Sequence, residues 1–257
     1  MMEILVAGAE RLGLTLDARS IALFETYYRE LSAWNEQFNL TAISGYEQVQ
    51  SRHFLDALTC LLALPVPGAG DAIPDVVPLL HRGYPLRFAD VGSGAGFPGL
   101  PIKIILPDVR MTLIEATGKK VRFLRHMVET LGLRDVQVLH ARAEEVGQMP
   151  EHRESYDVVT ARAVARMATL LEYCLPLCRV GGRMIAQKGE DAAAEVETDA
   201  AAIPILGGRL VAVKGLPAAL DPLAEIADHY LVVVDKAART PESYPRRPGM
   251  PAKRPLG

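Results

Sequence analysis

The chain has 257 residues, of which 49% are hydrophobic and 23% charged, a composition typical of a folded globular protein and unlike that of a disordered chain. No apolar run approaches the roughly 18 residues that a membrane-spanning helix needs, and the first residues lack the basic stretch of a secretory signal. The 3 cysteines have no compact spacing, which fits a reducing compartment better than a disulfide framework. We therefore expect a cytoplasmic protein that does not span a membrane.

Two of the cysteines, Cys174 and Cys178, lie four residues apart with Pro176 between them and no histidine nearby. Small buried apolar side chains explain this pair better than ligands of a metal ion do. We expect no metal site.

The charge is unevenly distributed along the chain. Its net value is -3, but residues 236–257 hold six basic residues and one acidic residue, so this segment carries +5 and the rest -8. A basic segment on an acidic body is a candidate phosphate contact. A solvated, proline-rich terminus is the alternative.

The first 64 residues are expected to form a small helical lobe. Residues 17–38 form the first predicted helix, with Asp17 as its N-cap, and residues 46–64 form a second. The apolar side chains of the first helix recur at helical spacing: Ile21, Phe24, Tyr28, Leu31 and Trp34. Residues 65–85 contain five prolines and three glycines and are predicted to be a loop or linker.

From residue 86 onward, predicted strands alternate with predicted helices. The strands are expected at 86–92, 109–116, 136–142, 156–164, 181–189, 208–216 and 229–237, and the helices at 99–106, 118–133, about 167–178 and 190–206. This alternation predicts an α/β fold with a mainly parallel sheet covered on both faces. The main domain is assigned to residues 86–238, and residues 239–257 form a basic, proline-rich tail.

The glycine-rich loop that follows the first of these strands is the main candidate site, because ligands of open parallel sheets bind at the carboxyl ends of the strands. Gly94, Gly96 and Gly99 have the G-x-G-x-x-G spacing of dinucleotide-binding proteins, and Glu115 lies where an acid would bind a ribose. A nicotinamide-dependent oxidoreductase is therefore one interpretation. A glycine-rich turn without a ligand is another.

Three features favour S-adenosylmethionine over a dinucleotide. Asp90 precedes the first glycine by two residues, and its carboxylate suits an ammonium group better than a pyrophosphate. Pro98 lacks the backbone N–H that a pyrophosphate would use. Two further strands follow the fifth, as in seven-stranded methyltransferases.

Several separated stretches carry a resemblance that extends from about residue 30 to the end: "WNEQFNLTAI", "HFLDAL", "DVGSGAGFPGLPIKI", "GKKVRFL", "ARAEE", "ARAVA" and "SYPRRPGMPAKRPLG". In these stretches the chain resembles the RsmG (GidB) family of bacterial 16S rRNA (guanine-N(7))-methyltransferases. The segment at 65–85 is longer than in the compact members of that family.

The resemblance implies a class I, Rossmann-like methyltransferase with a seven-stranded, mainly parallel sheet. It implies transfer of a methyl group from S-adenosyl-L-methionine to N(7) of a guanosine in the decoding region of 16S rRNA. The partner would be the 16S rRNA, the small ribosomal subunit or an assembly intermediate, and the enzyme a monomer. A methyltransferase of a small molecule or protein and a module that only binds its ligand are the remaining alternatives.

The donor site implied by the residues and by the resemblance together consists of Asp90, Gly92, Gly94, Gly96, Phe97, Glu115, Ala116, Thr117, Ala143, Glu144 and Arg162. The resemblance implies that Gly92 and Phe97 flank the methionine part. It assigns the ribose to residues 115–117, the adenine to residues 143–144, and a position between donor and target to Arg162. The alternatives are a core position for Phe97, a helix cap for Glu144 and a surface ion pair for Arg162.

No general base is expected, because N(7) of guanine already carries an exposed lone pair. Catalysis should depend on alignment of the reactants and exclusion of water, with Arg162 as the candidate positioning residue. His53 and Asp56 lie three residues apart on one helical face. A pair that locks this helix to the sheet is the favoured interpretation, and approach to the pocket is the alternative.

Basic side chains near the site and in the tail are candidate RNA contacts: Lys119, Lys120, Arg122, Arg125, Lys188, Arg246, Arg247, Lys253 and Arg254. Lys119 and Lys120 lie at a predicted helix start, where their charge opposes the helix dipole. A further interaction must therefore favour lysine at these positions, and RNA binding is the interaction that we expect.

Overall fold

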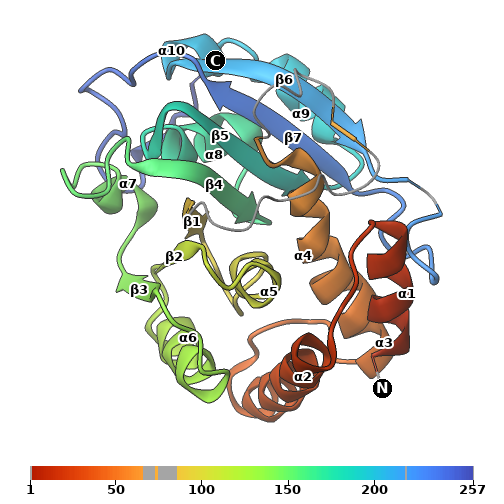
Figure 1. The fold of residues 1–257 in the computed structure, drawn as a ribbon. Coiled ribbons are helices and arrows are strands. Elements are labelled where there is room, and N and C mark those ends of the chain that lie inside the picture. The colour runs from red at the N-terminus through yellow and green to blue at the C-terminus, as the bar shows by residue number, and fades with distance from the viewer. Residues whose placement is uncertain (1, 66–72, 75–85, 218, 257) are drawn as a thin grey trace.

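A seven-stranded sheet forms the centre of the computed structural model, which describes residues 2–65, 73–74, 86–217 and 219–256 (Figure 1). The strand order is β3-β2-β1-β4-β5-β7-β6, with β7 antiparallel to both of its neighbours and the other pairs parallel. The strands are β1 (Arg87–Val91), β2 (Arg110–Glu115), β3 (Val136–His140), β4 (Tyr156–Arg162), β5 (Cys178–Lys188), β6 (Gly208–Gly215) and β7 (Tyr230–Lys236). The predicted α/β fold with a mainly parallel sheet is confirmed.

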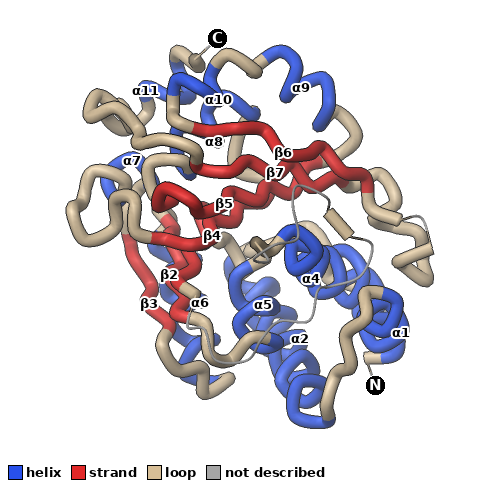
Figure 2. Tube along the Cα trace, turned by 45° about the horizontal axis from the view of Figure 1, so that its top comes forward, coloured by secondary structure: helices blue, strands red, loops and turns tan. Residues whose placement is uncertain are grey.

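Helices cover both faces of the sheet (Figure 2). On one face lie α1 (Glu3–Arg11), α2 (Ala18–Phe38), α3 (Tyr46–Val49), a π-helical turn (Gln50–Leu55), α4 (Asp56–Thr59), a 3-10 turn (Cys60–Ala63), α5 (Gly99–Ile105) and α6 (Gly118–Thr130). On the other face lie α7 (Ala143–Val146), α8 (Met167–Cys174), α9 (Ala192–Thr198) and α10 (Ala202–Ile205), while α11 (Met250–Lys253) contacts α8. In the described ranges, no helix is long and apolar enough to cross a membrane.

The predicted first helix is confirmed as α2, and its ends have identifiable causes. The Asp17 side chain accepts a hydrogen bond from the Ser20 N–H at 2.7 Å, as an N-cap does, and Asn39 ends the helix in a left-handed conformation. Of the predicted apolar side chains, Phe24 and Leu31 are buried, and the other three are half-buried against the same core. Tyr27, which was not among them, is fully buried. This face packs in the same hydrophobic core as one side of the sheet, so the lobe and the sheet share a core.

Two predicted helices have different boundaries in the structure. The helix expected at 167–178 ends at Cys174, and Cys178 begins β5, because Pro176 cannot continue a helix. The helix expected at 190–206 is divided into α9 and α10. Asp199 lies between these two helices. Its carboxylate accepts a hydrogen bond from the Ala168 N–H at 2.8 Å, an N–H in the first turn of α8 that has no partner within that helix.

Three short helices, α1, α7 and α11, were not predicted. Most of the predicted linker at 65–85 lies outside the described residues. The domain boundaries therefore stay predictions.

The basic tail packs against the main domain as ordered structure. The Arg153 guanidinium donates hydrogen bonds to the backbone oxygens of Thr240 at 2.9 Å and Tyr244 at 2.7 Å. Further along, Thr169 of α8 donates a hydrogen bond to the Pro251 carbonyl at 3.1 Å. The tail is therefore held at several points along its length.

The strongest of these attachments is the ion pair of Arg246 with Glu172 of α8. The guanidinium contacts both carboxylate oxygens at 2.6–3.1 Å, and the Arg246 backbone N–H donates a further hydrogen bond at 2.8 Å. The Glu172 side chain has 0% exposure. Arg246, a predicted RNA contact, is thus engaged within the protein.

We expect Arg246→Met to lower the free energy of unfolding by about 3 kcal/mol, because the Glu172 carboxylate would remain buried without its counter-ion. The measurement is urea unfolding. The neighbouring exposed Arg247→Met is the control and should change stability by less than about 0.5 kcal/mol. Equal midpoints for the two variants would contradict the anchoring role.

Candidate functional site

The glycine-rich loop connects β1 to α5 at the carboxyl edge of the parallel strands. Gly92, Gly94 and Gly96 have φ values of +67°, +59° and +97°, a conformation that side chains disfavour. A Cβ at Gly94 would meet no protein atom closer than the Gly92 oxygen at 3.7 Å. The protein itself therefore leaves space at Gly94 for close approach of a ligand.

Asp90 lies beneath this loop and supports it from inside. Its carboxylate accepts hydrogen bonds from Thr160 Oγ1 at 2.9 Å and from the Gly99 N–H at 3.2 Å, the latter at the start of α5. The residue is completely buried, and burial raises the pKa of Asp90 to about 6, although its hydrogen bonds oppose this shift. Asp90 is therefore placed to support the loop from below and has no surface of its own at the site.

Glu115 ends β2 and faces the loop from the neighbouring strand. Its two carboxylate oxygens accept hydrogen bonds from the Gly94 N–H at 2.9 Å and from the Thr117 N–H at 2.7 Å. Ala116 and Thr117 follow it on the exposed turn before α6. The structure therefore brings the predicted ribose-binding residues against the glycine loop.

Phe97 is buried in a stack of aromatic rings. Its ring lies 5.2 Å from that of Tyr27 and 4.5 Å from that of His53, with interplanar angles of 7° and 25°. The Tyr27 hydroxyl also donates a hydrogen bond to the Ala95 carbonyl at 2.6 Å. The N-terminal helices thus hold the loop through Phe97, which is a core position as well as a loop position.

Arg162 lies at the end of β4, with its guanidinium carbon 5.0 Å from the centre of the Phe97 ring. The guanidinium contacts the lobe through the Arg52 carbonyl, the Asp56 carboxylate and the His53 ring. Burial and the Arg162 charge lower the pKa of His53 to about 3, so this ring is neutral at physiological pH. The structure therefore brings Arg162 and Phe97 together at one end of the loop.

Ala143 and Glu144, the predicted adenine-binding pair, begin α7 just after β3. Glu144 is buried, and its carboxylate accepts a hydrogen bond from the Gly249 N–H of the tail at 2.8 Å. The tail therefore contacts Glu144, one of the two residues predicted to bind the adenine.

Among the predicted RNA contacts, Lys119 and Lys188 have partners within the protein. Lys119 donates to the Phe38 carbonyl at the end of α2 at 2.6 Å, an interaction that explains a lysine at this helix start. Lys188 pairs with Glu195 at 2.7 Å and donates to the Ala165 carbonyl at 3.1 Å. These contacts give both side chains a structural role.

Arg122 and Arg125 lie on exposed positions of α6, and Lys120 is half-buried near Gly94, its Nζ 4.0 Å from the position of a Cβ there. Arg122 also lies over the Phe38 ring, and the distance from its guanidinium carbon to the ring centre is 5.5 Å. Of these three cations, Lys120 is the one that reaches the glycine loop.

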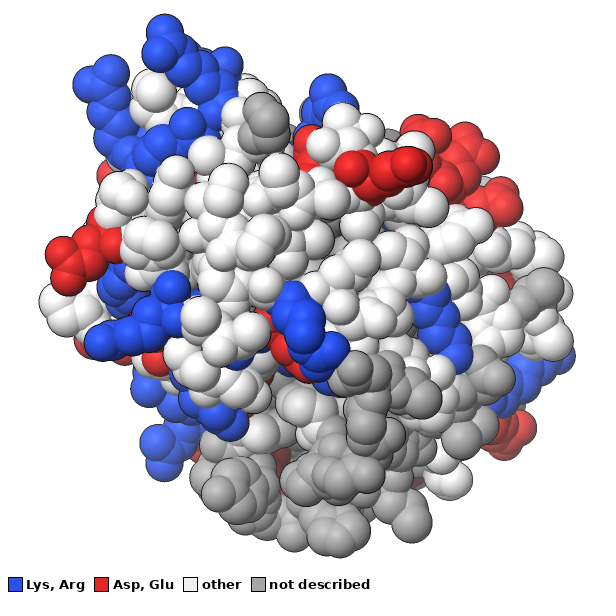
Figure 3. Space-filling view, turned by 90° about the horizontal axis from the view of Figure 1, so that it is seen from above, with Lys and Arg blue, Asp and Glu red and all other residues white. Residues whose placement is uncertain are grey.

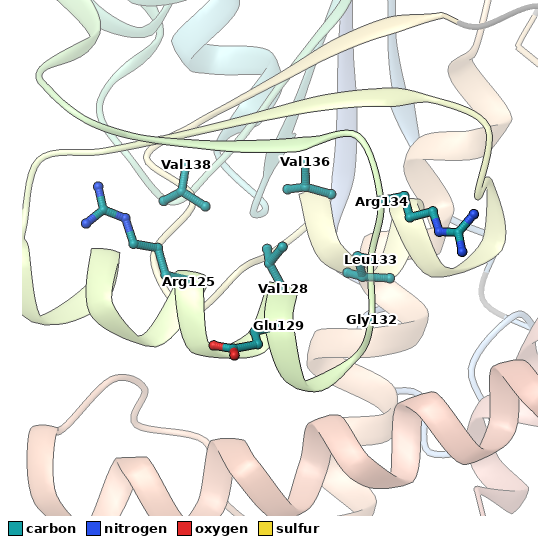
Figure 4. Close-up of a pocket in the computed structure, with 8 residues that line it drawn as sticks. All are labelled: Arg125, Val128, Glu129, Gly132, Leu133, Arg134, Val136 and Val138. Atoms are coloured by element: carbon teal, nitrogen blue, oxygen red, sulfur yellow. The ribbon is translucent and has the colours of Figure 1, made fainter.

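Arg125 lines a groove of about 470 Å³ between α6 and the edge strand β3 (Figure 4). The groove is lined by Arg125, Val128, Glu129, Gly132, Leu133, Arg134, Val136 and Val138. None of the predicted donor-binding residues belongs to this set, so the groove is separate from the glycine loop.

Two residues at the site had no sequence signal. Tyr27 is buried, but it was not among the apolar positions predicted for its helix, where Tyr28 was named instead. His229 precedes β7 and donates from Nδ1 to Asp56 at 2.8 Å, a contact that spans 173 residues. In the part of the chain that the structure describes, no cluster of three or more His, Cys, Asp or Glu side chains is placed to hold a metal ion.

A glycine-rich loop after β1, an acid at the end of β2 and an antiparallel β7 in a seven-stranded sheet define a class I S-adenosylmethionine-dependent methyltransferase. Residues 20–221 match the family described as rRNA small subunit methyltransferase G. A relative of that name from Roseiflexus sp. (strain RS-1) is 50% identical over 255 residues, which cover 99% of this chain and 100% of the relative.

A second relative of the same name, from Pelotomaculum thermopropionicum, is 44% identical and covers 100% of this chain and 99% of its own. The chain therefore belongs to the rRNA small subunit methyltransferase G family. The expected enzyme class, an S-adenosyl-L-methionine-dependent rRNA methyltransferase, is confirmed. Among solved structures, the antibiotic-resistance methyltransferase Kmr aligns with a TM-score of 0.48 at 15% identity, over 60% of this chain and 89% of that chain.

We expect Gly94→Ala to weaken donor binding at least about tenfold, because the methyl group would fill the space beside the loop backbone. The measurement is titration calorimetry with S-adenosylhomocysteine. Gly132→Ala is a matched control, since Gly132 has nearly the same φ of +60° and open surroundings but lies at the end of α6, away from the loop. Equal donor affinities in the two variants would contradict the assignment.

Proposed function

We propose that this chain transfers the methyl group of S-adenosyl-L-methionine to N(7) of a guanosine in the decoding region of 16S rRNA, at the carboxyl edge of β1, β2 and β4. Family membership supports the reaction. The location of the donor site is inferred from the hydrogen bond between Glu115 and the Gly94 N–H. This contact places a carboxylate that can bind ribose hydroxyls beside an open glycine loop.

In this proposal the donor lies along the loop. Its methionine part contacts the backbone of residues 92–97, where the Gly94 surroundings are open and Phe97 is fixed by stacking. Its ribose hydroxyls bind Glu115, and residues 116–117 line the same turn. Its adenine lies against Ala143 and Glu144, beside the tail residue Gly249.

Asp90 is completely buried, so we propose that it acts on the donor as a negative charge beneath the loop and does not contact it directly. A carboxylate there favours the ammonium and sulfonium charges of the donor at short range, since the surrounding protein screens charge less than water does. The same residue keeps the first N–H of α5 satisfied, so its two roles are compatible.

The proposed chemistry requires alignment and not proton transfer. S-adenosyl-L-methionine supplies an electrophilic methyl group on its sulfonium, and guanine N(7) attacks with its own lone pair. The protein orients the guanine and excludes water, which removes the entropy cost of bringing the reactants together. Arg162 and Phe97 are the residues proposed to orient the base, because they lie together at the end of the loop.

The tail and the start of α6 are proposed to contact RNA phosphates. Arg247, Lys253 and Arg254 are exposed and lie close to Gly249, which touches Glu144. On the face seen in Figure 3, Lys and Arg side chains form several separate groups with uncharged surface between them. RNA contact is therefore proposed to occur through discrete cations near the site rather than through one continuous basic surface.

The remaining predicted cations are either further proposed RNA contacts or partners of other groups in the protein. Lys120 and Arg125 extend the proposed surface along α6, and Arg122 lies beside them. Lys119, Lys188 and Arg246 are assigned to protein contacts, and the structure supports that assignment through their short hydrogen bonds.

We also propose that the enzyme acts as a monomer in the cytoplasm, without membrane association, on the 16S rRNA, the small subunit or an assembly intermediate. The three cysteines are buried and not joined in disulfides, which supports a reducing compartment.

Neutralising the exposed tail cations should weaken RNA binding about tenfold at low salt and reduce the salt dependence of log K by about 2 to 3, because up to three phosphate contacts are lost. The variant combines Arg247→Gln, Lys253→Gln and Arg254→Gln. The matched control removes three exposed charges at the amino ends of strands, opposite the site: Arg110→Gln, Arg134→Gln and Arg179→Gln. Donor affinity should be unchanged in both, and equal RNA affinities would contradict the tail assignment.

The substrate is tested by mass mapping of 16S rRNA from cells that lack this protein. We expect N(7)-methylguanosine to disappear from one position and to return when the wild-type gene or the Gly132→Ala gene is supplied, but not with Gly94→Ala. Full retention of the modification in the deleted strain would contradict the proposed substrate.

A further inference from the structure

A buried carboxylate joins the N-terminal lobe to two strands of the sheet. Asp56 begins α4, directly after the π-helical turn, and its side chain is 1% exposed. One carboxylate oxygen accepts a hydrogen bond from Arg162 at 3.1 Å, and the other accepts one from His229 Nδ1 at 2.8 Å. Each oxygen therefore binds a donor at a different strand of the sheet, β4 and the start of β7.

Within the described residues, the lobe supplies the hydrogen-bond partners of the Arg162 guanidinium. Besides Asp56, its nitrogens contact the Arg52 carbonyl at 2.9 Å and His53 Nδ1 at 3.2 Å. The neutral His53 ring lies in the same group of contacts, with Nδ1 also 3.1 Å from the Arg52 carbonyl oxygen and Nε2 2.8 Å from Thr41 Oγ1. The strand thus places Arg162, and the lobe fixes its orientation over Phe97.

We infer that Asp56 is the positioning residue for Arg162 in methyl transfer. The inference rests on the proposed function, in which Arg162 orients the guanine. A carboxylate can accept from two donors at once, whereas an asparagine of the same size offers only one acceptor oxygen. Asp56 is therefore the group that can satisfy Arg162 and His229 together.

The carboxylate also has an electrostatic consequence for the reaction. Positive charge moves from sulfur to the guanine ring as the methyl group transfers, and a bare guanidinium nearby would oppose it. With Asp56 at 3.1 Å, the pair carries no net charge, so Arg162 can direct hydrogen bonds without opposing the charge that develops. Loss of the Asp56 charge should therefore affect kcat more than KM.

Other contacts between the same lobe and the β6–β7 connection do not reach Arg162. Ser51 donates to the Asp221 carboxylate at 2.6 Å, and Arg11 donates to the Ala219 carbonyl at 2.7 Å. These hydrogen bonds attach the lobe without involving the proposed pocket. Ser51→Ala is therefore a matched control for Asp56→Asn.

The test is a double-mutant cycle of Asp56→Asn and Arg162→Met, with small ribosomal subunits from cells lacking the enzyme as substrate. We expect Asp56→Asn to lower kcat about tenfold with little change in donor affinity, and to lower it by less than about twofold when Arg162 is already Met. Ser51→Ala should stay within about twofold of the wild type.

Equal factors for Asp56→Asn in both backgrounds would overturn the inference, because Asp56 would then act independently of Arg162. An unchanged kcat in Arg162→Met would instead overturn the proposed role of Arg162 itself. If Asp56→Asn alone does not fold, the kcat of Arg162→Met is compared with that of the double variant. The double variant has no guanidinium at position 162 that would be left without its carboxylate. Equal rates for those two support the inference, and a further fall in the double variant overturns it.

Discussion

The burial of Phe97 among aromatic rings of the N-terminal helices is the constraint on which the site depends. Three glycines in the left-handed region give the loop little intrinsic preference for one shape, so its shape must be imposed from outside. Stacking on Tyr27 and His53 imposes it, and each such ring pair contributes about 0.5–1.5 kcal/mol beyond the area that it buries. Gly96 shows how close the packing is, since a Cβ there would collide with the Tyr27 hydroxyl. The N-terminal lobe therefore supports the loop of the proposed donor site.

The same packing determines where the charges lie. Asp90 lies below the loop, Glu115 faces it from the next strand, and Asp56 compensates Arg162 at its far end. Carboxylates thus surround the proposed site, where we propose that positive charge moves from sulfur to a purine ring without any proton transfer. A reaction that needs no general base is compatible with a His53 that is buried, neutral and stacked on Phe97.

Much of the fold followed from sequence because parallel strands buried on both faces are nearly continuous apolar runs, and because Asp17 has the local chemistry of a helix cap. The features that did not follow depend on partners distant in sequence. Asp199, between α9 and α10, accepts a hydrogen bond from the first turn of α8, and Arg246 pairs with Glu172, 74 residues away in the sequence. Charge alone cannot show whether an arginine faces water or a buried acid. His229 lay in no motif, so only the fold could bring it to Asp56.

The most direct measurement is a crystal structure with S-adenosylhomocysteine bound. We predict that its homocysteine part lies against the backbone of residues 92–97 and that its ribose hydroxyls replace the Gly94 N–H as the partners of Glu115. We also predict that the Asp56–Arg162 pair stays intact, with the guanidinium still over Phe97. Ligand bound in the groove between α6 and β3, with the contact of Glu115 and Gly94 unchanged, would contradict the account.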